Sequence, residues 1–185
     1  MKYKSKLVTL KMSKNKKYKK TYENKIPSTN PAFQKIINFY LFECPAENRS
    51  ARGKTLAEYG WKKRWPLETL KKKLIEASVG NLDHLFFSGS PCDLSQKFKE
   101  AEKLSPCNEY CVFLSNEAKS TMQSLFAAIR NSFAHGSFAV RRYKDEYGKY
   151  QRMYFLCNYD GYCKAEIVLN EKTLLSWIKI IKSGP

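Results

Sequence analysis

The sequence predicts a mainly α-helical domain that ends in a three-stranded antiparallel β meander and a final helix. Apolar residues recur at helical spacing through much of residues 31–135, and the spacing changes to strict alternation after Gly136. We therefore expect a single domain over residues 26–185. Its parts are a helical core at 31–135, the meander at 137–169 and the last helix at 171–183.

Helices are expected first at residues 32–42, where aromatic and aliphatic side chains recur every three or four positions. Residues 54–63 are expected to form a second helix. Pro66 suits the first turn of a third helix, which extends over about residues 67–79.

The next segment is expected to hold one more helix and a loop. Asp93 and Gln96 resemble a capping box, in which two side chains bond the first backbone N–H groups of a helix. That helix would end near Leu104, and residues 105–114 are expected to form a loop.

The longest predicted helix extends from about Asn116 to His135 and has two faces. The apolar face is expected to pack against the core and consists of Met122, Leu125, Phe126, Ile129 and Phe133. The opposite face is small and uncharged, which would permit close approach of the same helix in a symmetric homodimer. The predicted dimer interface consists of Ser120, Ser124, Ala127 and Ala128. The alternative is that the protein's own helices cover this face.

Strands are expected in the C-terminal part of the chain, at residues 138–143, 150–158 and 162–169. The segments between them contain Gly148 and Asp160-Gly161, which are typical of hairpin turns. Asn170 is expected to cap the final helix.

The composition indicates a polyanionic partner. The chain has 34 Lys and Arg against 17 Asp and Glu, a net charge of +17, and ten of the lysines lie in residues 1–25. We expect RNA as the partner and residues 1–25 to be a basic arm. The predicted RNA-binding residues are Lys16, Lys17, Lys19, Lys20, Arg141 and Arg142. A solvated lysine-rich surface is the alternative.

The sequence has no run of 18 apolar residues and no apolar signal segment, which predicts a soluble cytoplasmic protein without a membrane partner. The six cysteines form no Cys-x2-Cys pair, so free thiols are expected. His84, Cys92, Cys107 and Cys111 match no zinc-finger spacing. No phosphate-binding glycine loop or hydrolase motif is present either, so we expect no metal and no cofactor.

The remaining candidate chemistry lies at the end of the longest predicted helix. Arg130 can bind phosphate oxygens through its planar N–H groups, and His135 can transfer protons near neutral pH. Both lie in the last turns of the helix, where the helix dipole favours positive charge. The simpler interpretation of His135 is a residue that caps the last carbonyl groups.

Residues 129–136, with the sequence Ile-Arg-Asn-Ser-Phe-Ala-His-Gly, resemble the signature of the HEPN family. In that signature an arginine, often followed directly by asparagine, precedes a histidine by a few residues. The resemblance implies a HEPN-like helical bundle, with Arg130 and His135 catalytic and Asn131 orienting the histidine or the substrate. It also implies a homodimer whose paired motifs form one cleft.

The function that this resemblance implies is a metal-independent endoribonuclease that cleaves RNA by attack of the 2′-hydroxyl group on its own phosphate. Members of the family act as toxins or antiphage-defence effectors, so a cognate antitoxin or defence-system partner is also expected. The alternative function is a catalytically inactive RNA- or protein-binding module that uses the same helix for dimerisation.

Overall fold

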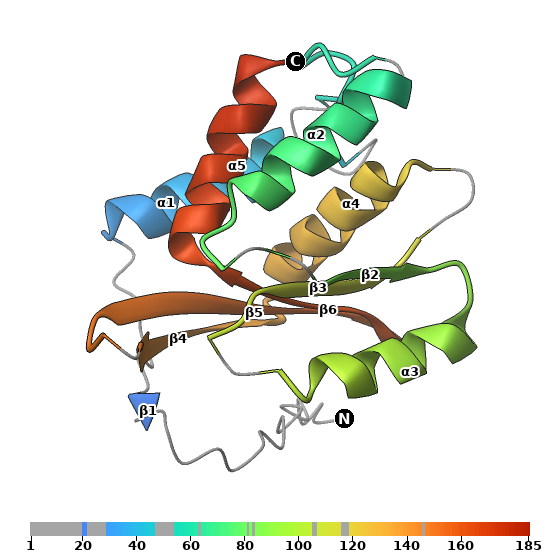
Figure 1. Cartoon of the computed structure of the whole chain (residues 1–185). Helices are drawn as coiled ribbons and strands as arrows, with labels where there is room; N and C mark the ends of the chain where they lie inside the picture. Colours follow the sequence, from blue (N-terminus) through green and yellow to red (C-terminus); the bar gives the residue numbers. More distant parts are fainter. Residues whose placement is uncertain are drawn as a thin grey trace, which may run out of the picture.

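The computed structural model is an α/β fold and not the mainly helical bundle expected from the sequence (Figure 1). It describes residues 20–21, 29–46, 54–62, 64–80, 82, 84–104, 107–115, 119–145 and 147–185. In chain order the elements are β1 (Lys20–Thr21), α1 (Pro31–Asn38), the π-helical segment η1 (Phe39–Glu43), α2 (Arg64–Glu76), β2 (His84–Ser88), α3 (Pro91–Ala101), β3 (Tyr110–Leu114), α4 (Thr121–Ala134), β4 (Phe138–Lys144), β5 (Tyr150–Asp160), β6 (Tyr162–Asn170) and α5 (Glu171–Ser183).

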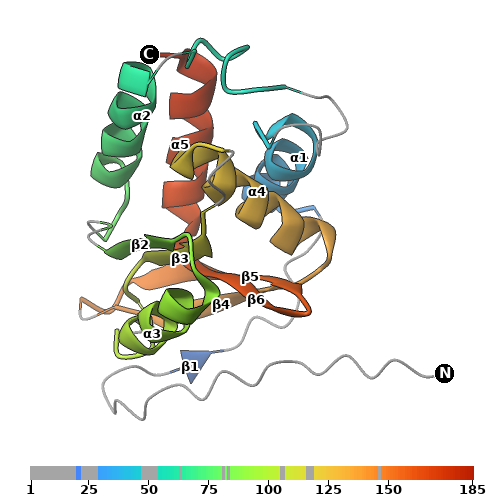
Figure 2. The same cartoon turned by 90° about the vertical axis from the view of Figure 1, so that its right-hand side faces the viewer.

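The described strands form one mixed sheet in the order β1-β4-β5-β6-β3-β2. β2 and β3 are parallel, since α3 connects them as a crossover, and every other neighbouring pair is antiparallel. Helices α1, α2, α4 and α5 lie on one face of the sheet, and α3 lies on the other (Figures 1 and 2).

Two strands account for the wrong fold class. β2 lies inside the region expected to be a helical core, and β3 occupies the end of the predicted loop at residues 105–114. Both are five-residue strands with nearly continuous apolar character, and such short runs show neither the helical nor the alternating period. β3 is the inner of the two and is buried on both faces, as expected of a strand between covering helices.

The sheet separates two hydrophobic cores. The larger core contains Phe126, Ile129, Tyr154 and Trp177 and lies between the sheet and helices α1, α2, α4 and α5. The smaller core lies beneath α3 and includes Leu94, Val112 and Phe155. Because β3, β5 and β6 contribute side chains to both cores, these strands form the rigid frame on which the helix ends are placed.

Several predicted helix boundaries are wrong for reasons of local capping. α4 begins at Thr121 because Ser120 and Gln123 form a capping box, so it is shorter than the predicted helix 116–135. Ser90 caps α3, in place of the predicted Asp93 box. In the described part of the predicted helix 54–63, the backbone turns at residues 56–60 and forms no helix.

Other local predictions are confirmed. The three C-terminal strands form an antiparallel meander within the larger sheet, with Gly148 and Gly161 at positive φ in the turns. Asn170 caps α5 by accepting a hydrogen bond from the backbone N–H of Lys172 at 2.9 Å.

The start of α5 is held in place by a buried carboxylate. Glu109 accepts hydrogen bonds from the backbone N–H groups of Asn170, at 2.6 Å, and of Gly80, at 2.9 Å. This carboxylate therefore ties the end of β6 to the loop after α2.

Among the helices that the structure describes, none combines the length and the apolar composition needed to cross a bilayer.

Candidate functional site

Arg130 lies on the partly exposed side of α4, one helical turn before the helix ends at Ala134. Its Nη1 donates a hydrogen bond to Asn131 Oδ1 at 3.3 Å, whereas its buried Nε has no hydrogen-bond partner within the described part of the chain. No carboxylate among the described residues pairs with this guanidinium. A buried donor without an acceptor costs about 1–3 kcal/mol. The Nε–H group of Arg130 is therefore a buried donor that no described residue satisfies.

The buried thiol of Cys44, directly after η1, is within electrostatic reach of Arg130. Burial raises the pKa of this thiol well above its usual value, and the nearby charge of Arg130 acts in the opposite direction. The thiol donates a hydrogen bond to the carbonyl oxygen of Phe126. Cys44 therefore stays protonated and helps to fill the space under α4, and it is no nucleophile.

His135 is the C-cap residue of α4. Its backbone N–H donates to the carbonyl oxygen of Asn131 at 3.0 Å, and Gly136 follows with a positive φ of 64°. The imidazole is exposed and makes no hydrogen bond to another described residue, so it does not cap the last carbonyl groups. Asn131 and His135 are one turn apart, on the same side of the helix.

The turn between β5 and β6 lies near this histidine. The pKa of Asp160, the last residue of β5, is lowered mainly by its hydrogen bond and ion pair with Lys164, and the charge of His135 contributes as well. His135 is thus within electrostatic reach of a carboxylate from a separate hairpin. Two thiols lie further along this hairpin, with Cys157 Sγ and Cys163 Sγ 3.9 Å apart.

The predicted dimer face is partly covered by the chain itself. Ser124 and Ala128 are only 6% and 5% exposed, and Ser120 serves as the N-cap. Of the four residues, Ser120 and Ala127 are partly exposed. The alternative, in which the protein's own helices cover this face, therefore holds for two of its four residues, Ser124 and Ala128. The partly exposed stripe of α4 consists of Gln123, Ala127, Arg130, Asn131 and Ala134.

Of the predicted RNA-binding residues, the structure describes Lys20, Arg141 and Arg142, and the two arginines do not share a face of the sheet. Arg141 and Arg142 point to opposite faces of the sheet because they are adjacent in β4. Arg141 lies over the ring of Phe155, on the side of α3. The backbone of Lys20 pairs with Tyr143, which places β1 beside Arg142. Lys16, Lys17 and Lys19, with most of the predicted arm 1–25, lie outside the described residues.

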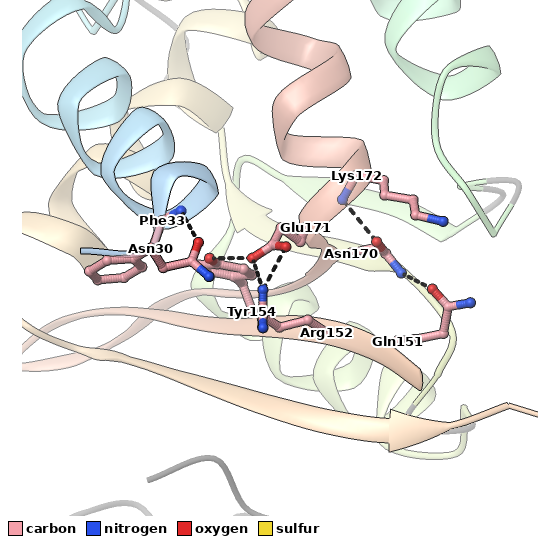
Figure 3. Close-up of polar contacts among 8 residues, drawn as sticks. All are labelled: Asn30, Phe33, Gln151, Arg152, Tyr154, Asn170, Glu171 and Lys172. Atoms are coloured by element: carbon pink, nitrogen blue, oxygen red, sulfur yellow. Dashed lines mark hydrogen bonds and ion pairs between the residues drawn. The ribbon is translucent and has the colours of Figure 1, made fainter. Parts of the chain in front are cut away.

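A second polar site, not predicted from the sequence, lies where β4 and β5 meet the start of α5. It is a shallow cavity of about 260 Å³. Its lining residues are Arg142, Tyr150, Gln151, Arg152, Asn170, Glu171 and Lys172. Figure 3 shows Arg152 and Tyr154 of the sheet converging on Glu171 in the first turn of α5. The register of the β4–β5 hairpin makes Arg142 and Arg152 direct partners, and no local sequence signal gives this register.

Within the described ranges, no group of three or more His, Cys, Asp and Glu side chains is arranged to hold a metal ion. Cys111, one of the four zinc candidates, is buried in β3.

Comparisons of the chain with protein-family models, with curated proteins and with solved structures find no match.

Proposed function

We propose that this protein is a metal-independent endoribonuclease in which Arg130 binds the scissile phosphate and His135 transfers a proton. The observation that carries the proposal is the state of Arg130, whose guanidinium has no described carboxylate partner although its Nε is buried. A cation left in this way favours binding of an anion that comes from outside the chain.

The reaction is an internal transfer of a phosphodiester. The 2′-hydroxyl oxygen forms a bond to phosphorus, the bond from phosphorus to the 5′-oxygen breaks, and a cyclic 2′,3′-phosphate and a 5′-hydroxyl result. One proton leaves the 2′-hydroxyl group and another is delivered to the 5′-oxygen. Arg130 would stabilise the negative charge that develops on the phosphate oxygens in between. Asn131, which already holds Arg130, would fix its direction.

A second copy of the chain would complete this chemistry. A single imidazole cannot readily act as base and acid in the same step, whereas two copies of His135 related by a two-fold axis can divide these roles. The proposed contact uses the partly exposed stripe of α4 around Ala127, since Ser124 and Ala128 are already buried. Both motifs lie near the end of that stripe and would meet in one cleft.

The biological setting rests on the resemblance of residues 129–136 to the HEPN signature and on nothing in the fold, because the helical bundle of that family is not the architecture found. Within the proposal the protein acts in the cytoplasm as a toxin or antiphage-defence effector, with a cognate antitoxin or defence-system partner. The cysteines of the described residues are all free, as is usual in a reducing compartment.

The test is cleavage of RNA by the purified protein in EDTA under single-turnover conditions. His135→Ala and Arg130→Ala should each slow cleavage by about 10²–10⁴, the usual cost of removing an acid–base or charge-stabilising group. Lys99→Ala, an exposed change on α3, is the matched control and should cleave at the wild-type rate. Equal cleavage by wild type and His135→Ala would remove His135 from the mechanism.

The second candidate function is RNA binding without cleavage. The observation that favours it is the basic cavity at the start of α5, which lies away from Arg130 and His135 and needs neither of them. Binding of RNA by a folded protein that leaves every ribose substrate intact would place this function first.

A further inference from the structure

Two thiols lie side by side in the β5–β6 hairpin. Cys157 Sγ and Cys163 Sγ are 3.9 Å apart, and both side chains are partly exposed. Cys163 also donates a weak hydrogen bond to the carbonyl oxygen of Ala165 at 3.4 Å. Because solvent reaches both cysteines, a small reagent can react with either sulfur atom, unlike the buried thiols of Cys44 and Cys111.

A β-bulge sets the position of the two thiols. The register of the hairpin shifts after Asn158. Tyr159 pairs with Cys163, and Lys164 is left as an extra residue on β6. Cys157 lies two positions before Tyr159 and therefore on the same face of β5. The sulfur atoms need to approach by about 2 Å to reach the length of a disulfide bond, and rotation of the two short side chains about their Cα–Cβ bonds can supply this.

The two thiols differ in acidity. The hydrogen bond with Cys163 lowers the pKa of the Cys157 thiol, although partial burial and the charge of Glu166 act in the opposite direction. The same hydrogen bond raises the pKa of the Cys163 thiol, and burial adds to this effect. Cys157 therefore loses its proton first, and the thiolate is the form of cysteine that attacks a disulfide.

We propose that Cys157 and Cys163 form a reversible disulfide by exchange with a small disulfide such as oxidised glutathione. The Cys157 thiolate forms a bond to one glutathione sulfur, and the other glutathione leaves as a thiolate that takes up the proton released by Cys157. Cys163 then loses its proton and attacks Cys157 Sγ, which breaks the mixed disulfide and releases the second glutathione thiol. Two electrons pass from the protein to oxidised glutathione, and two molecules of reduced glutathione result.

The disulfide restrains the end of the hairpin that lies near His135. Asp160 lies between the two cysteines in the chain and is within electrostatic reach of His135. Closing the bond ties β5 to β6 directly before their turn, so the oxidation state of the pair controls how freely that turn can move. The proposal goes beyond nuclease activity and does not require it. It agrees with free thiols as the resting state, because disulfides in reducing compartments are mostly transient and redox-sensing.

The experiment incubates the whole folded chain in glutathione buffers of increasing oxidised fraction. The reaction is stopped with acid, and the remaining thiols are alkylated in denaturant and counted by intact mass. The chain has six cysteines, so the reduced protein carries six alkyl groups and the protein with one disulfide carries four. Peptide mapping identifies the linked pair. The variants are Cys157→Ser and Cys163→Ser, and Cys92→Ser, which removes an exposed thiol of α3, is the matched control.

The wild type should form the disulfide between Cys157 and Cys163 at a concentration of oxidised glutathione at least about tenfold lower than addition of glutathione to Cys92 needs, because the neighbouring thiol acts at a high effective concentration. Cys92→Ser should form the same disulfide, and excess reduced glutathione should restore every thiol. Cys163→Ser should keep glutathione on Cys157, since the second exchange step is lost.

Three results would overturn the proposal. The first is a folded wild type in which this pair stays reduced at concentrations that modify Cys92. The second is a disulfide that joins other cysteines or two chains, which peptide mapping and non-reducing electrophoresis detect. The third is a disulfide that forms only after the chain is unfolded, which circular dichroism of the oxidised sample distinguishes.

Discussion

Adjacent alanines of α4 provide a sharp test of the dimer proposed here. Ala127 is partly exposed and packs against the larger core from outside, whereas Ala128 is 5% exposed and lies within that core. Arginine at each position therefore meets a different environment. The same substitution, made one residue apart, separates an effect on association from an effect on folding.

The expected magnitudes follow from burial. Ala128→Arg must either overpack the core, at about 1–3 kcal/mol, or bury a charge, at several kcal/mol more. That sum is a large fraction of the 5–15 kcal/mol by which domains are usually stable, so this variant should unfold or melt far below the wild type. Ala127→Arg should cost about 1 kcal/mol in the monomer, because Ala127 is partly exposed and only borders the larger core.

The assay is sedimentation combined with thermal unfolding at micromolar concentration. The wild type should sediment as a dimer, and Ala127→Arg as a folded monomer with strongly reduced RNA cleavage. A monomeric wild type would refute the dimer. A dimer that persists in Ala127→Arg would place the interface elsewhere on the molecule. Unfolding of Ala127→Arg would contradict the assignment of Ala127 to the partly exposed side of α4.

Two further predictions concern carboxylates. Burial raises the pKa of Glu166, and the hydrogen bond from Tyr110 acts in the opposite direction. Wild-type stability is therefore lost as pH rises from the unfolded pKa of about 4.3 through the higher folded pKa. Glu166→Gln should be more stable than the wild type at neutral pH but not below about pH 4. Denaturant titrations of both proteins at the two pH values measure this, and equal stability of the two proteins at neutral pH would contradict the burial argument. Glu171→Gln should lower stability by about 1–3 kcal/mol because Arg152 loses two hydrogen bonds to a carboxylate while the neighbouring Arg142 remains, and chemical denaturation beside the wild type measures this loss. Wild-type stability in that variant would contradict this role of Glu171.

The C-terminal part of the fold could be predicted because its signals are local. The turn glycines Gly148 and Gly161 mark the hairpins, and the side chain of Asn170 marks the start of α5. β2 and β3 could not be predicted in the same way. Their pairing joins residues far apart in the sequence, as with Tyr110 and Val168, and depends on an α3 crossover that no local period reveals.

The candidate site, too, could be predicted only where its signals are local in the sequence. The placement of Arg130, Asn131 and His135 in the last turns of a helix follows from the sequence, because helical spacing and Gly136 place them there. The burial of Ser124 and Ala128 depends on tertiary packing, so it could not be predicted from the sequence. The cavity could not be predicted, because neither the register that pairs Arg142 with Arg152 nor the position of α5 above them is visible in the local sequence pattern.

The measurement that tests the central claim most directly compares a ribose substrate with the same oligonucleotide carrying one 2′-deoxy residue at the cleaved position, in EDTA. We predict that the wild type cleaves the ribose substrate to a cyclic 2′,3′-phosphate and a 5′-hydroxyl and leaves the deoxy substrate intact. His135→Ala should cleave the ribose substrate about 10²–10⁴ more slowly. Cleavage of the deoxy substrate, or wild-type cleavage by His135→Ala, would contradict the account.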